Sequence, residues 1–202
     1  MIITDVKQLR EKCEPCSSVE EGEEIGTQLL KELNATDNGI GLAANQIGIN
    51  KRVCIINVKE PIILINPKIR KASKESFVIP EGCLSYPKDK HILTERHTWV
   101  EVTADNYESK LSFSSESGDV NDAFECACVQ HEIDHLDGII HYDRKHIVVP
   151  YKAPEKIGRN EKVTITNGKE TRIVKYKKAK RLLDKDWKLS DIQIPDPEGL
   201  HE

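Results

Sequence analysis

Hydrophobic residues at helical spacing mark two segments of the chain. Between residues 17 and 34 they recur three and four positions apart, after serines and an acidic first turn that form a possible capping box. Between Asp122 and Leu136 the sequence DAFECACVQHEIDHL has a second helical pattern, with Asp122 as a possible N-cap and Gly138 as its end. The sequence therefore predicts helices over residues 17–34 and 122–136.

Runs rich in β-branched residues between the two helices predict strands. They are RVCIINV (52–58), PIILINPKIR (61–70), residues 75–80 and HILTERHTWVEVTAD (91–105), and the polar stretch 106–121 is predicted as a hairpin or a loop. Together with the helices they predict an α+β fold, in which antiparallel sheets surround a central helix that carries a His-Glu-x-x-His motif.

The pattern changes after Pro150. A linker-like segment leads to KVTIT-NG-KETRIVKY, two β-rich runs about Asn167 and Gly168, which predicts a hairpin. A short helix through KAKRLLDKDW (178–187) and a polar tail follow. We therefore expect two parts, a catalytic domain over residues 1–150 and a C-terminal appendage over residues 151–202.

Composition narrows the class of protein. The chain has 202 residues, a net charge of -4 and 32% charged residues, which suits a soluble protein without an overall bias toward nucleic acid or membranes. We see no signal sequence and no apolar run near the ~20 residues that a membrane span needs, so we expect a cytoplasmic location and no membrane partner. Six cysteines in such a chain are expected to be reduced thiols that serve as metal ligands or core residues.

The appendage differs in charge from the rest of the chain. Between Lys156 and Arg181 there are ten Lys or Arg residues against two Glu residues. Such a basic run is either a solvated face or a phosphate-binding patch, and the sequence leaves both interpretations open.

The stretch QHEIDHLDGIIH contains two histidines one helical turn apart. His131 and His135 lie on the same side of a helix, so both imidazoles can bind one metal ion, with Glu132 beside the open coordination position. A catalytic divalent metal needs three protein ligands and a free position for water. The two histidines therefore predict a third ligand elsewhere.

Three candidates for the third ligand remain open at this point. His141 would complete a longer zinc-protease pattern, but that pattern also requires a methionine turn, and Met1 is the only methionine in the chain. A downstream glutamate would have to come from the appendage. Cys83, in IPEGCLSYP, follows Gly82 in a turn that can present a thiolate.

Three motifs together resemble one family. GIGLAANQ (39–46), EGCLS (81–85) and QHEIDH (130–135) match, in order and spacing, the three motifs of peptide deformylases. The resemblance covers roughly residues 1 to 148. It implies an enzyme that removes the formyl group from the N-terminal methionine of new polypeptides and releases formate. It also implies one divalent metal ion, with Fe²⁺ as the native ion and Zn²⁺, Ni²⁺ or Co²⁺ as possible substitutes.

The same resemblance implies roles for individual residues. Cys83, His131 and His135 would bind the metal, which leaves one position for water. Glu132 would act first as general base and then as general acid. The side-chain amide of Gln46 and the main-chain N–H of Leu84 would stabilise the oxyanion. Glu81 and Arg96 occupy positions that resemble those of the family's Glu and Arg, which implies a buried ion pair that braces the Cys83 turn. A surface charge is an equally good interpretation of either residue.

The formyl-methionyl peptide would bind next to these groups. Ile40 and Gly82 are expected to pair with its main chain, and the glycines around Ile40, including Gly41, would allow a close backbone approach. The methionine side chain would enter an apolar pocket, for which the candidates are Ile79, Phe124, Ala127 and Cys128. Ordinary core packing is an equally good interpretation of each of these four residues taken alone.

Two features depart from the family pattern. His141 stands where relatives often have an aromatic residue. The appendage faintly resembles the zinc-binding tail of the bacterial secretion ATPase, but the cysteine positions of that tail correspond to Val163, Ile165 and Ala179, so we predict apolar packing and no metal there. Its lysines suggest a contact with the ribosome or with RNA. Two alternatives to a deformylase are a zinc endopeptidase that uses His141, and an inactive relative that binds ribosomes or RNA.

Overall fold

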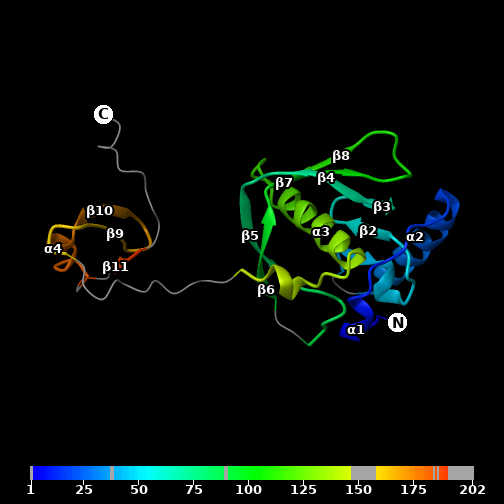
Figure 1. Cartoon of the computed structure of the whole chain (residues 1–202), viewed down its shortest axis with the longest axis horizontal. Coiled ribbons are helices and arrows are strands. Elements are labelled where there is room, and N and C mark those ends of the chain that lie inside the picture. Colours follow the sequence, from blue (N-terminus) through cyan, green and yellow to red (C-terminus); the bar gives the residue numbers. More distant parts are fainter. Residues whose placement is uncertain are drawn as a thin grey trace. The chain divides into compact units, whose positions relative to one another are not determined.

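The computed structural model describes residues 2–36, 39–88, 91–146, 158–183, 185 and 187–190. The chain divides into two compact units, Met1–His146 and Ile147–Glu202 (Figure 1). The boundary that we predict, between residues 150 and 151, lies outside the described residues. Among the helices of the described ranges, none has both the length and the apolar character required to cross a bilayer.

Within its described residues the first unit contains three β-sheets, and every pairing between their strands is antiparallel (Figure 1). The expectation of a mixed α/β fold with antiparallel sheets is therefore confirmed. The sheets have the strand orders β1-β2-β3, β4-β7-β8 and β5-β6. The strands are β1 (Gly41–Ala43), β2 (Val53–Asn57), β3 (Pro61–Ile65), β4 (Lys68–Ala72), β5 (Ser76–Glu81), β6 (Ile92–His97), β7 (Trp99–Thr103) and β8 (Leu111–Ser114).

Helix α2 (Val19–Asn34) covers one face of the β1-β2-β3 sheet. The Oγ atom of Ser18 caps the helix by accepting the Glu21 N–H at 3.2 Å, so the predicted helix is confirmed with a start slightly later than residue 17. A Cβ atom at Gly22 or Gly26 would overlap an isoleucine of β3. These two glycines therefore allow the helix to approach the sheet closely.

Helix α3 (Val120–Leu136) packs on the same sheet from the other side and also contacts β8. Cys54 and Ile56 of β2 belong to the α3 core, whereas Val53 and Ile55 belong to the α2 core. This alternation explains why β2 reads as a continuous apolar run, because a strand that is covered on both faces has no polar face.

The C-terminal half of α3 is buried on all sides. Every residue from Cys126 to Leu136 is buried, including His131, Glu132 and His135. Its N-cap is Asp119, whose side chain accepts the Asn121 N–H at 2.8 Å, so the prediction of Asp122 as N-cap is wrong. The Asp122 carboxylate instead accepts hydrogen bonds from Lys59 and Ser117. Gly138 follows the helix with a φ of +73°, as expected for a helix end.

Two predicted strands are each divided in the structure. The run PIILINPKIR divides at Asn66, which has a φ of +51° and whose side-chain oxygen accepts the Cys16 N–H at 2.8 Å, so β3 and β4 belong to different sheets. The run HILTERHTWVEVTAD divides at Thr98 into β6 and β7, which also lie in different sheets. Strand β8 pairs with β7, so of the two structures predicted for residues 106–121, a hairpin or a loop, the hairpin is the one observed.

Short elements complete the first unit. They are α1 (Val6–Leu9), the 3₁₀ helix η1 (Ala44–Ile47) and the 3₁₀ helix η2 (His141–Arg144). The Arg10 guanidinium forms an ion pair with the Asp143 carboxylate at 2.6 Å and thereby joins the end of α1 to η2.

The appendage forms a small sheet of its own, with the strand order β10-β9-β11. Strands β9 (Lys162–Thr166) and β10 (Thr171–Lys175) form the predicted hairpin, and β11 is Lys188–Leu189. Helix α4 covers Tyr176–Ala179, so the helix predicted over 178–187 begins earlier and is much shorter. Val163, Ile165 and Ala179 are buried in one apolar cluster, as expected for these positions. The polar tail lies outside the described residues.

Candidate functional site

Three side chains that can bind a metal ion converge in the first unit. The donor atoms of Cys83, His131 and His135 all lie within 4.8 Å of one another. The Cys83 Sγ atom is 3.3 Å from His135 Nε2, and the two imidazole rings are 4.9 Å apart between centroids. Helix α3 supplies both histidines, and the turn after β5 supplies the cysteine.

The geometry of this donor set fits a divalent ion. A tetrahedral site with usual metal–sulfur and metal–nitrogen bonds separates its ligand atoms by about 3.5 Å. The Nδ1 atom of His131 is 2.9 Å from Glu81 Oε2, which directs the Nε2 atom of the ring toward the other donors. A thiolate with two imidazoles is a set that suits Zn²⁺ and several other transition metals.

His141 is not a member of this set. It is buried in η2, with its ring centroid 6.0 Å from that of His131 and 5.0 Å from that of Tyr86. In the described parts of the chain, the cluster of possible ligands contains Cys83 and not His141. The geometry therefore favours the cysteine among the three candidates for the third ligand.

A network of charged groups, buried except for Arg144, connects the segments that supply the donors. Arg96 donates two hydrogen bonds to Glu81, at 2.6 and 2.8 Å, so the ion pair expected from the sequence is confirmed. Arg96 also contacts Asp134 at 2.5 Å, and Arg144 donates two hydrogen bonds to the same carboxylate. The network thus ties β5 and β6 to α3 and η2.

Electrostatics keeps Glu81 ionised within this network. Burial by itself raises the pKa of Glu81, but hydrogen bonds from Arg96 and His131 outweigh it and lower the pKa below its usual value. A buried carboxylate that loses its partner typically costs about 3–5 kcal/mol. Sequence reasoning missed Asp134 and Arg144 as members of this network, although Asp134 lies directly before His135 in the motif.

Glu132 lies beside the donors with an unusual environment. Burial is the main cause that raises its pKa to about 7, and the nearby Glu81 charge adds to the effect, while His131 and Arg96 oppose it. Its Oε2 atom has no hydrogen-bond partner among the described residues. A Cβ atom at position 41 would come within 2.5 Å of Glu132 Oε1, so Gly41 leaves the space that this carboxylate occupies.

Gln46 points its amide nitrogen at the donor cluster. Its Oε1 atom accepts the Ala43 N–H at 2.8 Å, which fixes the orientation of the amide. Its Nε2 atom is 3.2 Å from Ser85 Oγ and 3.6 Å from Cys83 Sγ. Within the described residues, the main-chain N–H of Leu84 has no recorded acceptor.

A cavity of about 640 Å³ opens over these groups. Six of the seven residues that the sequence suggests for substrate binding line it, namely Ile40, Gly41, Gly82, Phe124, Ala127 and Cys128. The seventh, Ile79, is buried in β5 and does not line the cavity.

The cavity also contains residues that sequence reasoning missed. Pro80, Tyr86, Pro87 and His91 line it, and no motif marks them because they come from the turn and strand ends around Cys83. A Cβ atom at Gly82 would come within 2.8 Å of the His91 ring. Cys128 donates its S–H to the Ile40 carbonyl at 3.2 Å, and burial raises the pKa of this thiol well above its usual value.

Known proteins resemble this chain over most of its length. The sequence model described as "Polypeptide deformylase" matches residues 1–150. A protein named peptide deformylase 2 from Clostridium perfringens is 41% identical over 139 residues, which cover 67% of this chain and 85% of that protein. A peptide deformylase from a Picosynechococcus species is 37% identical and covers 68% of this chain and 74% of that protein.

Solved structures agree in fold. The crystal structure of peptide deformylase from Thermotoga maritima superposes with a TM-score of 0.64 at 28% identity, over 73% of this chain and 97% of that one. A peptide deformylase from Synechococcus elongatus in complex with actinonin has a TM-score of 0.62 at 31% identity, over 73% of this chain and 79% of that one.

The Glu81 contact leads to a testable prediction about metal binding. Glu81→Gln removes the charge that orients His131, so the affinity for Zn²⁺ should fall by about 10- to 100-fold. Competition with a chromogenic chelator measures this affinity. Glu101→Gln, which removes the half-buried partner of the exposed Lys110, is the control and should leave the affinity unchanged. Equal Zn²⁺ affinity in both variants would contradict a role for Glu81 in the site.

Proposed function

Because the chain belongs to the peptide deformylase family, we propose that Cys83, His131 and His135 hold the metal ion on which its activity depends. The enzyme is a hydrolase that removes the N-terminal formyl group from formyl-methionyl polypeptides and releases formate. The observation that supports the proposed site most directly is the convergence of the three donors. Two of them, Cys83 and His131, line the same cavity as Glu132 and Gln46.

We propose Fe²⁺ as the native ion, with Zn²⁺, Ni²⁺ or Co²⁺ as possible replacements. A divalent ion with an open coordination position supplies a Lewis acid and lowers the pKa of water toward about 7. The donor set supports a catalytic divalent ion, because it offers three protein ligands, the number expected in a catalytic site. The choice of Fe²⁺ rests on the family resemblance.

Glu132 is the proposed acid–base group. Its carboxylate would accept a proton from the attacking water and then deliver that proton to the departing amine. Two features support the assignment. Oε2 is buried without a partner among the described residues, and Glu132 lines the cavity, where Gly41 leaves room for Oε1.

Gln46 and Leu84 are the proposed donors to the oxyanion. The Gln46 amide is held by the Ala43 N–H before any charge develops, so it needs no reorganisation when the formyl carbon becomes tetrahedral. The Leu84 N–H belongs to the same turn as Cys83 and has no recorded acceptor among the described residues. Both donors therefore lie close to the proposed metal ligands.

We propose that the peptide binds along the cavity wall. The main chains of Ile40 and Gly82 would pair with it, and Gly41 would allow its close approach. Phe124, Ala127 and Cys128 would contact the methionine side chain, which their place in the cavity lining supports. We assign Ile79 to the packing of β5 rather than to direct contact.

We divide the roles of the chain between its two parts. Residues 1–150 would form the catalytic domain, and the basic appendage over residues 151–202 would bring the enzyme to the ribosome in the cytoplasm, where formylated chains emerge. The excess of Lys and Arg over Glu between residues 156 and 181 supports an attraction to a polyanionic surface.

The proposed metal ligand can be tested through Cys83. Cys83→Ala should retain less metal and release formate from formyl-Met-Ala-Ser more than ~100-fold more slowly. The loss of a metal ligand should cost more than the loss of a residue that only hydrogen-bonds to a ligand, which typically costs about 10- to 100-fold. Cys16→Ala, which changes a core cysteine, is the control. Retained metal and activity in Cys83→Ala would refute the assignment. Cleavage of an internal peptide bond, assayed in parallel, should be absent.

The oxyanion donor can be tested through Gln46. Gln46→Ala should lower kcat by about 100- to 1,000-fold and leave KM nearly unchanged, because the donor acts on charge that develops only in the transition state. Gln46→Glu keeps an oxygen for the Ala43 N–H but loses the donor, so it should lower kcat as well. A near-normal kcat in either variant would contradict this role.

The ribosome contact can be tested by truncation. A chain that ends at residue 153 should cosediment with purified ribosomes less than the full chain, because it lacks the basic segment. Its formate release from a free peptide should stay unchanged, which also shows that the catalytic domain remains folded. Unchanged cosedimentation would exclude the appendage as the contact.

A further inference from the structure

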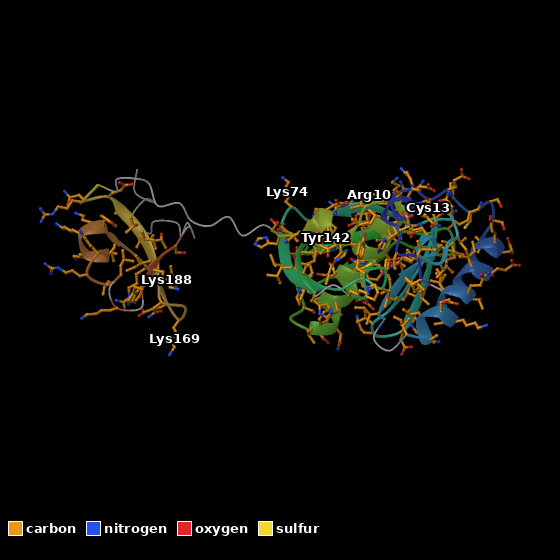
Figure 2. The ribbon with its side chains drawn as sticks, turned by 90° about the horizontal axis from the view of Figure 1, so that it is seen from below. Arg10, Cys13, Lys74, Tyr142, Lys169 and Lys188 are labelled. Carbon is orange, nitrogen blue, oxygen red and sulfur yellow. The ribbon has the colours of Figure 1, made fainter. Side chains whose placement is uncertain are left out.

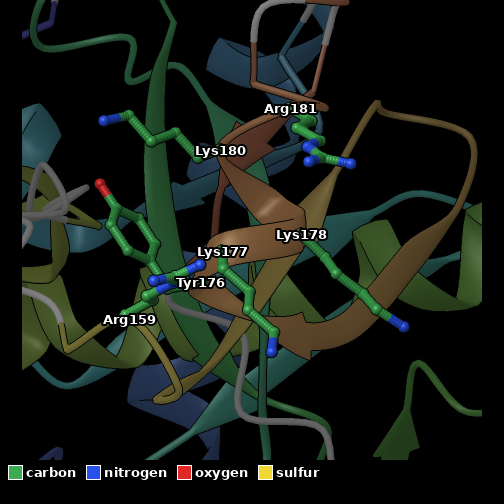
Figure 3. Close-up of a pocket in the computed structure, with 6 residues that line it drawn as sticks. All are labelled: Arg159, Tyr176, Lys177, Lys178, Lys180 and Arg181. Atoms are coloured by element: carbon green, nitrogen blue, oxygen red, sulfur yellow. The ribbon is translucent and has the colours of Figure 1, made fainter.

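The appendage has a hollow of about 630 Å³ lined mainly by basic side chains (Figure 3). We call it the basic cleft, and its lining residues are Arg159, Tyr176, Lys177, Lys178, Lys180 and Arg181. It belongs entirely to the second unit and lies outside the residues that the deformylase family model matches.

Main-chain hydrogen bonds bring the cleft residues together. The Tyr176 N–H donates to the Glu161 carbonyl at 2.8 Å, and the Lys177 N–H donates to the Arg159 carbonyl at 3.0 Å. These bonds hold the segment before β9 against α4, so Arg159 joins a group of residues that is otherwise local in sequence. Ala179 is fully buried and anchors α4 to the apolar cluster.

The carboxylates that the structure describes near the cleft do not neutralise its cationic groups. Within residues 158–183, the acidic residues are Glu161 and Glu170. Glu161 accepts the Gly158 N–H, and Glu170 pairs with Arg172 at 2.8 Å. No ion pair to the five basic residues of the cleft occurs among the described residues. All five are exposed, so their positive charges are available to a ligand.

From this arrangement we propose that the basic cleft binds single-stranded RNA. Five cations can follow a run of phosphates. The half-buried Tyr176 packs against the apolar cluster and also lines the cleft, so it is the aromatic group on which a base can stack. The inference rests on the proposed function, in which the appendage contacts the ribosome. It adds that single-stranded RNA is what the appendage binds there.

The surface of the appendage argues against a membrane as the partner. Basic segments that bind anionic bilayers usually add exposed apolar side chains that enter the interface. Every large hydrophobic residue that is exposed in the described chain belongs to the first unit, and none lies between residues 158 and 190. A concave surface with one aromatic ring also fits a single strand of RNA better than it fits a flat bilayer.

The test uses the full chain and a fluorescent 12-nucleotide oligouridine in an anisotropy titration. The triple variant Lys177→Gln, Lys178→Gln and Lys180→Gln should bind at least about tenfold more weakly than wild type. If all five cations contact phosphates, the slope of log K against log salt should change from about -3.5 to about -1.4. Tyr176→Leu should weaken binding several-fold, whereas Tyr176→Phe should retain it.

A matched control has the same change in net charge. Lys74→Gln, Lys169→Gln and Lys188→Gln remove three lysines that lie outside the cleft (Figure 2), and this variant should bind RNA within about twofold of wild type. Equal weakening in the two triple variants would overturn the proposal, because it would mean that net charge and not the cleft governs binding. Binding to phosphatidylserine vesicles without binding to RNA would also overturn it, in favour of a membrane.

Two further readouts separate this inference from the proposed function. Formate release from a free peptide should be the same in wild type and in the cleft variant, and Glu132→Ala should lose that activity and keep RNA binding. A third measurement, cosedimentation with ribosomes, tests the proposed ribosome contact. RNA binding without ribosome binding would remove the ribosome as partner and keep the cleft as an RNA site, while no RNA binding by wild type would remove the cleft itself.

Discussion

The site depends on the buried ion pairs of Arg96 with Glu81 and Asp134. One carboxylate lies at the end of β5, two residues before Cys83, and the other lies on α3, directly before His135. The guanidinium therefore joins the two segments that supply the three donor atoms. A buried ion pair gives little net stability because its desolvation is costly, so its main effect here is to fix a distance. The hydrogen bond between His131 Nδ1 and Glu81 also fixes the orientation of one of the imidazole rings.

The six cysteines differ in how deeply their side chains are buried. Burial raises the pKa of Cys13, Cys16, Cys54, Cys126 and Cys128, so each of these thiols stays protonated. Cys83 instead lies in a turn at the cavity, is only partly buried, and is close to His131 and His135. Its position therefore separates the cysteine that we propose as a metal ligand from the five cysteines of the core. The neutral Cys128 can then serve as an apolar wall of the same cavity.

Local patterns in the sequence predicted local features well. Helix α2 and the β9–β10 hairpin follow from capping and from an Asn-Gly turn, and both are confirmed. The Glu81–Arg96 ion pair, which the family resemblance implied, is confirmed as well. Features that depend on distant contacts were missed. The break at Asn66 depends on its bond to Cys16, and the change of N-cap depends on the partners of Asp122. For the same reason the cavity positions of Tyr86 and His91 carried no signal, and Ile79 could not be told from core.

The donors come from distant parts of the chain, since Cys83 and His135 are 52 residues apart in the sequence. A nascent chain that ends before α3 has at most one of the three proposed ligands, so an ion at this site would be captured only after residue 135 has left the ribosome and the helix has packed. The free energy of ion binding is then part of the free energy of folding. An enzyme that processes newborn polypeptides thus cannot acquire its own reactive centre until most of its own synthesis is over.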